Sequence, residues 1–131
     1  MYLLDTCTLL WLAGNAHQQL SKKAQEAITG FPGHLAISAI SALEIGIKAR
    51  LGKIGLQTDP RSWFTAAVEK HGLHEIPVNG NIAAASTMLP SLHKAPCARV
   101  IIATAQVYLF TILTPDDLIA KYPGVATLWL W

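Results

Sequence analysis

The chain has 131 residues, a length that suits one domain with a single hydrophobic core. Hydrophobic residues make up 52% of it and charged residues only 14%, against roughly 25% in an average protein, so we expect a partner to cover part of the surface. The formal net charge of +2 is too small to indicate nucleic-acid binding by itself, and no apolar run reaches the ~18 residues of a membrane-spanning helix.

Strands and helices alternate from the start of the chain, without repeats or an internal linker. The patterns of the first half predict a strand over 2–5, helices over 6–13 and 21–30, a strand over 34–38 and a helix over 41–51. Ser21 suits the N-cap of its helix, and Gly14 and Gly52 suit the positions where the first and third helices end.

The second half continues this alternation. Its patterns predict a helix over 60–72, a strand over 73–78, helices over 81–89 and 96–107, and strands over 108–114 and 125–129. Asp59 and Pro60 suit the N-cap and first turn of the fourth helix. Strands that are separated by helices pair in parallel. The expected fold of the single domain, residues 1–131, is therefore a three-layer α/β/α arrangement around a central parallel sheet of four to five strands.

Two acidic residues stand at the ends of apolar strand segments. Asp5 closes the first strand, and Asp116 follows the fourth. The ligand site of an open parallel sheet lies at the carboxyl ends of its strands, so these two side chains can meet although they are far apart in sequence. Several carboxylates in an apolar setting are costly unless they are compensated, usually by a divalent metal ion. The pattern predicts a metal-dependent site that cleaves phosphodiester bonds.

Glu44 lies in the helix predicted over 41–51 and is the third candidate. Helical spacing predicts an inward stripe formed by Ile40, Leu43, Ile47 and Leu51. Glu44 is one turn from two members of this stripe, which puts its carboxylate at the edge of the buried face. The alternative is an ordinary ion pair with Lys48, four residues further on. The two aspartates at the strand ends favour the site.

The same residues belong to a longer pattern. Its parts are Leu3-Leu4-Asp5-Thr6, the run from Ser38 to Lys48, Gly52-Lys53, Leu113-Thr114-Pro115-Asp116 and Tyr122-Pro123-Gly124. In this order, over essentially the whole chain, they resemble the PIN-domain toxins of VapBC-type toxin–antitoxin systems. The resemblance implies a cytoplasmic, Mg²⁺-dependent endoribonuclease, with Mn²⁺ as a substitute ion. It also implies a homodimer that a cognate antitoxin holds inactive, and it assigns the metal-site roles to Asp5, Glu44 and Asp116.

The chain departs from this family at the start of the helix predicted over 96–107. The family pattern there resembles His-x-Asp-Pro-x-Asp-Arg, whereas this chain has alanine at both aspartate positions, Ala95 and Ala98. The second loss is the more serious, because the family has a metal-site carboxylate at the position of Ala98. An inactivated variant and natural degeneration both account for the pair. We expect weakened metal binding and little or no turnover.

A non-catalytic PIN-fold module that binds RNA or an antitoxin is the alternative function. Other sites have weaker support. The spacing of His71 and His74 favours a structural role over zinc binding, and Cys7 favours a small buried residue over a nucleophile. Lys94 and Arg99 could contact phosphates, but solvated helix ends are an equal alternative. The two cysteines provide no disulfide framework, which indicates reduced thiols.

Overall fold

The structure is a computed structural model that describes residues 1–14 and 16–129. In this part of the chain, five parallel strands form one sheet in the order β3-β2-β1-β4-β5. The strands are β1 (Tyr2–Leu4), β2 (Leu35–Ser38), β3 (His74–Ile76), β4 (Thr111–Leu113) and β5 (Ala126–Leu128). The predicted parallel α/β fold is confirmed, with the larger of the two expected strand numbers.

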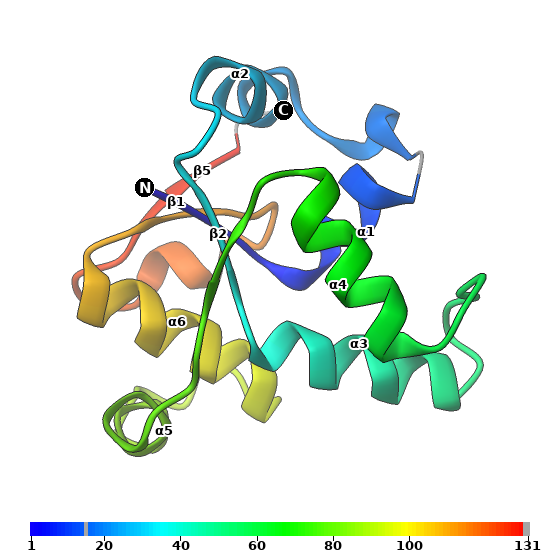
Figure 1. Cartoon of the computed structure of the whole chain (residues 1–131). Coiled ribbons are helices and arrows are strands. Elements are labelled where there is room, and N and C mark those ends of the chain that lie inside the picture. The colour runs from blue at the N-terminus through cyan, green and yellow to red at the C-terminus, as the bar shows by residue number, and fades with distance from the viewer. Residues whose placement is uncertain (15, 130–131) are drawn as a thin grey trace.

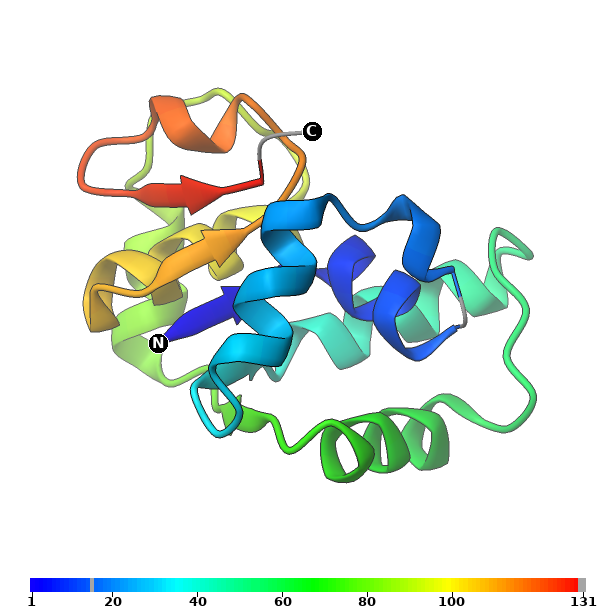
Figure 2. The same ribbon diagram turned by 90° about the horizontal axis from the view of Figure 1, so that it is seen from above.

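Helices cover both faces of this sheet (Figures 1 and 2). They are α1 (Thr6–Ala13), α2 (Lys22–Gly30), α3 (Ile40–Arg50), α4 (Pro60–Lys70), α5 (Gly80–Thr87) and α6 (Pro96–Tyr108), with short 3₁₀ turns η1 (His17–Gln19) and η2 (Ile119–Lys121). Ser21 and Asp59 cap α2 and α4 as predicted, each accepting a hydrogen bond from a backbone N–H of the first turn. The strand predicted over 108–114 is wrong at its start, because Tyr108 still belongs to α6.

Alternating residues of the central strands supply two hydrophobic cores. Leu4 and Leu113 face the layer formed by α1, α2 and α4, whereas Leu3 and Ile112 face α6. All four side chains are fully buried. Successive side chains of a strand point to opposite faces, so a central strand covered on both sides must be apolar throughout. Each such side chain contributes about 1.5–3 kcal/mol when fully buried.

The predicted inward stripe of α3 is wrong for two of its four members, although Ile40 packs against the hydrophobic core. Leu43 and Leu51 are 54% and 61% exposed, and the buried residues of this helix are Ser41 and Ile45. The Ser41 hydroxyl lies 2.9 Å from the Thr6 hydroxyl, which satisfies its hydrogen bonding in the interior. Because α3 packs against both α4 and α6, the residues that it buries depend on where these two helices lie.

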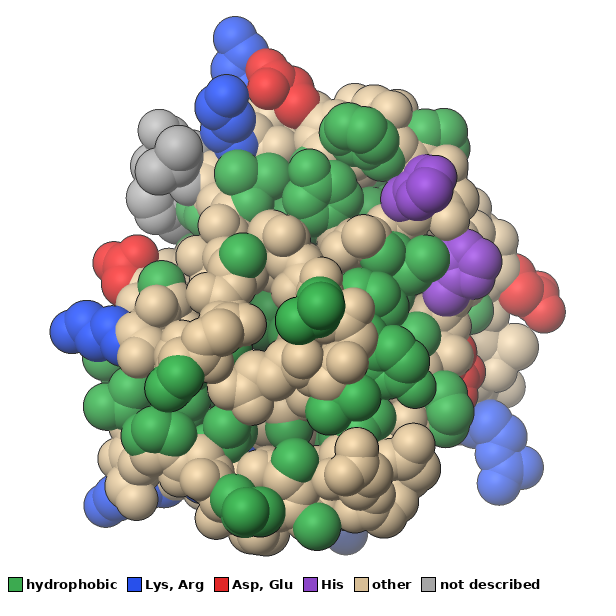
Figure 3. Space-filling view, turned by 90° about the vertical axis from the view of Figure 1, so that its left-hand side faces the viewer, with side chains coloured by type: hydrophobic (Ala, Val, Ile, Leu, Met, Phe, Trp, Pro, Cys, Tyr) green, Lys and Arg blue, Asp and Glu red, His purple; other side chains and the backbone are tan. Residues whose placement is uncertain are grey.

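Large hydrophobic side chains remain on the surface. The exposed ones include Phe31, Leu43, Met88, Tyr108 and Leu109. Figure 3 shows one face with hydrophobic side chains spread over its middle and most of its charged side chains near the outline. In the described part of the chain, no helix has the length and apolar character needed to cross a membrane.

Candidate metal site at the carboxyl ends of the strands

Asp5 and Asp116 come together where β1 and β4 end. These strands pair with Leu4 beside Leu113, so the residues that follow, Asp5 and Thr114, are neighbours. The Asp5 N–H donates to the Leu113 carbonyl oxygen at 3.3 Å. The Thr114 hydroxyl donates to Asp5 Oδ2 and accepts from the Asp116 N–H at 3.1 Å. One buried hydroxyl therefore links the two aspartates.

A cavity of about 150 Å³ opens at this edge of the sheet. Its polar wall includes Asp5, Glu44, Asp116 and Lys48, and its lining also contains Thr6, Cys7, Ala98, Ile101 and Ile119. All three carboxylates singled out in the sequence thus line one cavity, together with the alanine at the departure from the family pattern. They reach it from the end of β1, from α3 and from the segment after β4.

Asp5 serves as the N-cap of α1 as well as lining the cavity. Its Oδ1 accepts from the Thr8 N–H at 3.0 Å and from the Cys7 thiol at 2.9 Å, and it lies 3.1 Å from the Thr8 hydroxyl. With Thr114 on Oδ2, both carboxylate oxygens are engaged. An anion at a helix N-terminus is favoured by the helix dipole as well as by these donors. The same interactions that begin α1 therefore fix the orientation of Asp5.

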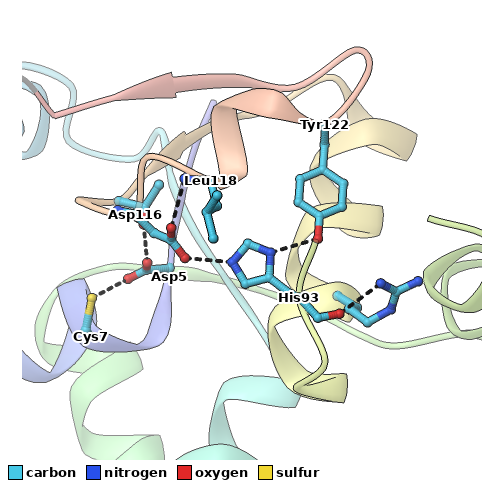
Figure 4. A network of polar contacts seen from close by, with 8 residues as sticks. Asp5, Cys7, His93, Asp116, Leu118 and Tyr122 are labelled. Carbon is cyan, nitrogen blue, oxygen red and sulfur yellow. Dashed lines mark hydrogen bonds and ion pairs between the residues drawn. The ribbon is translucent and has the colours of Figure 1, made fainter. Parts of the chain in front are cut away.

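Asp116 is hydrogen-bonded to His93, which is in turn hydrogen-bonded to Tyr122 (Figure 4). Its Oδ2 lies 2.7 Å from His93 Nε2, and the other ring nitrogen, Nδ1, lies 2.7 Å from the Tyr122 hydroxyl oxygen. Its Oδ1 accepts from the Leu118 N–H at 3.0 Å. The His93 side chain is 13% exposed and stacks on Tyr122, whereas Asp116 is 39% exposed. The Asp116 carboxylate is thus partly exposed to solvent, while the His93 ring that holds it is mostly buried.

Glu44 pairs with Lys48 across one turn of α3. Lys48 Nζ lies 3.5 Å from Glu44 Oε2, with the two side chains 34% and 25% exposed. A pair of this kind and exposure is worth only about 0.3–0.5 kcal/mol. The ion pair that was the alternative to a site role is therefore present, and it lies within the cavity wall. The two interpretations of Glu44 do not exclude each other.

The α6 side of the cavity carries no carboxylate. Ala95 is the N-cap of α6 and provides no side-chain hydrogen bond, and Ala98 lies in the first helical turn and lines the cavity. Both positions agree with those expected from the sequence. Next to Ala98 the wall continues with Ile101 and Ile119, so this half of the cavity is apolar.

Arg99 has a structural role that neither of its two interpretations predicted, since its guanidinium is bound to backbone carbonyl oxygens and is not a solvated helix end. Its guanidinium donates to the carbonyl oxygens of Ser86, Leu89, Pro90 and His93 at 2.8–3.1 Å. These carbonyls belong to the end of α5 and the loop between α5 and α6. Four hydrogen bonds in this geometry use the planar fork of the guanidinium to hold that loop in shape.

Both cysteines lie near the site and are poor nucleophiles. Burial raises the pKa of the Cys7 thiol far above its usual range, and the negative charge of Asp5 and the hydrogen bond to it act in the same direction. Burial also raises the pKa of Cys97, with a further contribution from Glu44. Cys7 is therefore a protonated hydrogen-bond donor to Asp5; it is partly buried, where a buried residue was predicted, and its contact with Asp5 was not expected.

The oxygen donors in the cavity are of the kind that binds a hard divalent cation. Carboxylate oxygens are the ligands that Mg²⁺ and Mn²⁺ prefer, and three of them line one cavity, so the chemistry fits. Among the described residues, however, no group of three or more His, Cys, Asp or Glu side chains is close enough to form a ready-made metal site. The residues converge, and the complete coordination shell is not preformed.

The sequence patterns missed the groups that support the carboxylates. Thr114 and His93 make the closest polar contacts of Asp5 and Asp116, and Tyr122 in turn contacts His93, yet each of the three comes from a different segment. Thr114 could have been found, because a hydroxyl that ends a buried strand beside an aspartate needs a partner. His93 and Tyr122 carry no local signal, since only the fold brings them together.

Comparisons with known proteins agree with the fold. No curated protein sequence matches the chain. Solved structures share its fold. VapBC2 from Rickettsia felis, bound to a promoter DNA fragment, has a TM-score of 0.72 and 14% identity over 98% of both chains. A toxin–antitoxin complex from Klebsiella pneumoniae has a TM-score of 0.64 and 24% identity over 97% of both chains. FitAcB from Neisseria gonorrhoeae has a TM-score of 0.63 and 20% identity over 98% of this chain and 96% of its own.

Structural likeness at such low identity establishes the shared fold. A sequence comparison adds the family, because the model of the PIN domain matches residues 2–125, nearly the whole chain. That match includes the three carboxylates of the cavity and the α6 wall opposite them. The chain belongs to the PIN-domain family.

Proposed function

We propose that this chain is the toxin of a type II toxin–antitoxin pair, with a site built for Mg²⁺-dependent endoribonuclease activity that Ala98 impairs. The observation that carries the proposal is that Asp5, Glu44 and Asp116 line one cavity with Ala98 in its wall. Membership of the PIN-domain family supports nuclease chemistry. The likeness to a Klebsiella pneumoniae toxin–antitoxin complex supports a cognate antitoxin as partner.

Asp5, Glu44 and Asp116 are the residues that would hold Mg²⁺ or Mn²⁺. When bound, the ion supplies Lewis-acid activation of water and neutralises charge that develops on the phosphate oxygens. The protein contributes orientation, since Thr114 and Cys7 fix the Asp5 carboxylate. The Lys48 ammonium offsets part of the negative charge in the cavity when no substrate is present.

An alanine at position 98 offers no metal ligand, and the neighbouring cavity wall, which contains Ile101 and Ile119, offers none in its place. The Ala98 methyl group stands in the first turn of α6, with Ile101 one turn further along the same wall. Fewer carboxylates bind a hard cation more weakly and constrain its position less. We therefore expect residual metal binding with little turnover.

A non-catalytic module remains the second candidate. It is favoured by one observation, the engagement of both Asp5 oxygens by protein donors, which leaves this carboxylate less free to bind a cation. In that case the cytoplasmic protein would act through RNA binding or antitoxin binding, with the exposed hydrophobic residues contributing to a homodimer.

The two candidates differ in the effect of restoring one carboxylate. The substitution Ala98→Asp should raise Mg²⁺-dependent cleavage of single-stranded RNA by roughly 100-fold or more, the effect of one charge-stabilising group in an active site. Ala95→Asp is the matched control, because it makes the same chemical change at the N-cap, and we expect little gain from it. Asp5→Asn combined with Ala98→Asp should abolish cleavage again. Equal cleavage by the present chain and its Ala98→Asp variant across a Mg²⁺ titration would refute the impaired-nuclease proposal.

A further inference from the structure

His93 is fixed at three points although it lies in a loop between two helices. Its Nε2 lies 2.7 Å from Asp116 Oδ2 and its Nδ1 lies 2.7 Å from the Tyr122 hydroxyl oxygen. Its carbonyl oxygen accepts from Arg99 at 3.0 Å. The ring is also stacked on Tyr122, with centroids 5.5 Å apart. A solvent-exposed histidine would lack such contacts, whereas these contacts hold the His93 ring in one orientation.

The two hydrogen-bond partners of the His93 ring indicate which of its nitrogens carries a proton. Asp116 Oδ2 is a carboxylate oxygen that accepts, so His93 Nε2 carries the proton and donates it. Nδ1 of the neutral ring is then an acceptor, and the Tyr122 hydroxyl, 2% exposed as a residue, donates to it. With these roles, each polar atom from Tyr122 to Asp116 has a partner. The Asp116 carboxylate therefore sets the proton on Nε2, and the Tyr122 hydroxyl holds the other side of the ring.

Arg99 fixes the loop from the other direction. It also donates to the carbonyl oxygens of Leu89 and Pro90, so the loop backbone before His93 is tied to α6. The position of Asp116 thus depends on residues from α6, from the α5–α6 loop and from the end of η2. The role of Arg99 seen in the structure is to hold the α5–α6 loop, and with it His93, in place.

We propose that His93 is a positioning residue that holds the Asp116 carboxylate in its orientation at the cavity, with Tyr122 and Arg99 holding His93. This inference rests on the proposed function, because it takes Asp116 as a metal-site carboxylate. Groups that hydrogen-bond to metal-ligating carboxylates typically change metal affinity or activity by 10–100-fold when they are removed. The polar chain in Figure 4 is such a support.

The first test uses the present chain and needs no activity. Long-range ¹H–¹⁵N NMR correlations at about pH 8, where free imidazole is neutral, should show His93 with a protonated Nε2 and an unprotonated Nδ1. Tyr122→Phe removes only the partner of Nδ1, so the proton should stay on Nε2, where the Asp116 carboxylate still accepts it. A His93 signal that is protonated at Nδ1, or already averaged between tautomers in the unsubstituted chain, overturns the proposal.

The second test measures Mn²⁺ binding by titration calorimetry, and RNA cleavage, in the Ala98→Asp background. His93→Ala should raise the Kd for Mn²⁺ about 10-fold or more and lower kcat, with KM for RNA little changed. His93→Gln keeps a donor toward Asp116 and should recover most of the loss. His74→Gln is the control, since His74 is also hydrogen-bonded, through Nε2 at 2.8 Å from the Gly33 carbonyl oxygen, but lies on β3 outside the cavity lining. We expect parental values from it.

Asp116→Asn in the same background separates the two proposals. If it abolishes Mn²⁺ binding while His93→Ala binds like its parent, the positioning role is wrong and the proposed function stands. If Asp116→Asn also binds Mn²⁺ and cleaves RNA like its parent, the proposed metal site itself is wrong. Weaker Mn²⁺ binding in both Asp116→Asn and His93→Ala, with binding restored in His93→Gln, supports the positioning role.

Discussion

Two helices begin at the same cavity but are terminated very differently. Asp5 caps α1 through the Thr8 N–H, and at its other end a Cβ on Gly14 would lie 2.6 Å from the Leu10 carbonyl oxygen, so only glycine fits. Helix α6 begins at Ala95, which offers no cap, and ends at Leu109, which adopts left-handed angles (φ 58°, ψ 42°) that cost a leucine about 1 kcal/mol.

Packing explains why α6 forms without good termini. In α6 six of 13 residues are buried, all between positions 100 and 105, and in α1 four of eight are buried. Burial of several side chains outweighs the roughly 1 kcal/mol that a cap provides. The fold of the α6 wall is therefore independent of the chemistry at positions 95 and 98. A chain can lose both carboxylates there and keep the cavity.

The largest effect expected from this comparison is in the core of α6. Ile102→Ala removes a fully buried side chain and should lower the free energy of unfolding by about 3–4 kcal/mol, because a cavity is left where packing is tight. Urea denaturation followed by circular dichroism measures it. The control Val107→Ala, at an exposed position of the same helix, should cost less than about 1 kcal/mol. Similar losses for the two variants would contradict the dominance of packing.

At α1, the cap should matter more than at α6. Asp5→Ala removes the N-cap and leaves the Thr114 hydroxyl and Cys7 thiol without their acceptor, so we expect a loss of roughly 2–3 kcal/mol. Asp5→Asn keeps one acceptor oxygen and should cost clearly less. Thermal and urea unfolding in metal-free buffer compare them. If the alanine variant is as stable as the parent, relief of repulsion between the carboxylates outweighs the cap.

A cap can also be added where one is lacking. Ala95→Asp should stabilise the protein by about 1 kcal/mol, since its side chain can accept from the exposed amides of the first turn of α6. Ala66→Asp introduces the same charge at an exposed position inside α4 and should give no gain. Urea unfolding midpoints distinguish the two. Equal shifts would mean that net charge, and not capping, is responsible.

The smallest effect concerns Cys7 and appears only at high pH. Because the folded protein keeps this thiol protonated while the unfolded chain ionises above about pH 8.5, its contribution to stability is complete below that pH and falls as pH rises. The slope is at most about 1.4 kcal/mol per pH unit. Cys7→Ser should flatten the decline of unfolding free energy between about pH 9 and 10.5. An unchanged slope would show that the thiol ionises in the folded protein.

Local sequence signals were sufficient for most elements of the fold. Asp59 before Pro60 and Ser21 before its helix located two helix starts, because capping depends on residues within one turn. The inward stripe predicted for α3 was incorrect at Leu43 because burial along this helix depends on distant segments of the chain. Leu43 and Ser41 differ in burial because α4 and α6 approach one side of the helix, which is a property of the whole chain.

The sequence by itself predicted the parallel sheet and the three candidate carboxylates, because alternating elements, strand ends and helical spacing leave a local pattern, while the resemblance to a family pattern drew attention to Ala95 and Ala98. The tertiary structure decided which groups support the carboxylates. His93 reaches Asp116 across 23 positions and Thr114 reaches Asp5 across 109, and such pairs form only where strand pairing and helix packing bring distant segments together. Hydrogen-bond geometry over a few ångströms leaves no trace in residue spacing, so the support of Asp116 by His93 and Tyr122 could be found only in the folded chain.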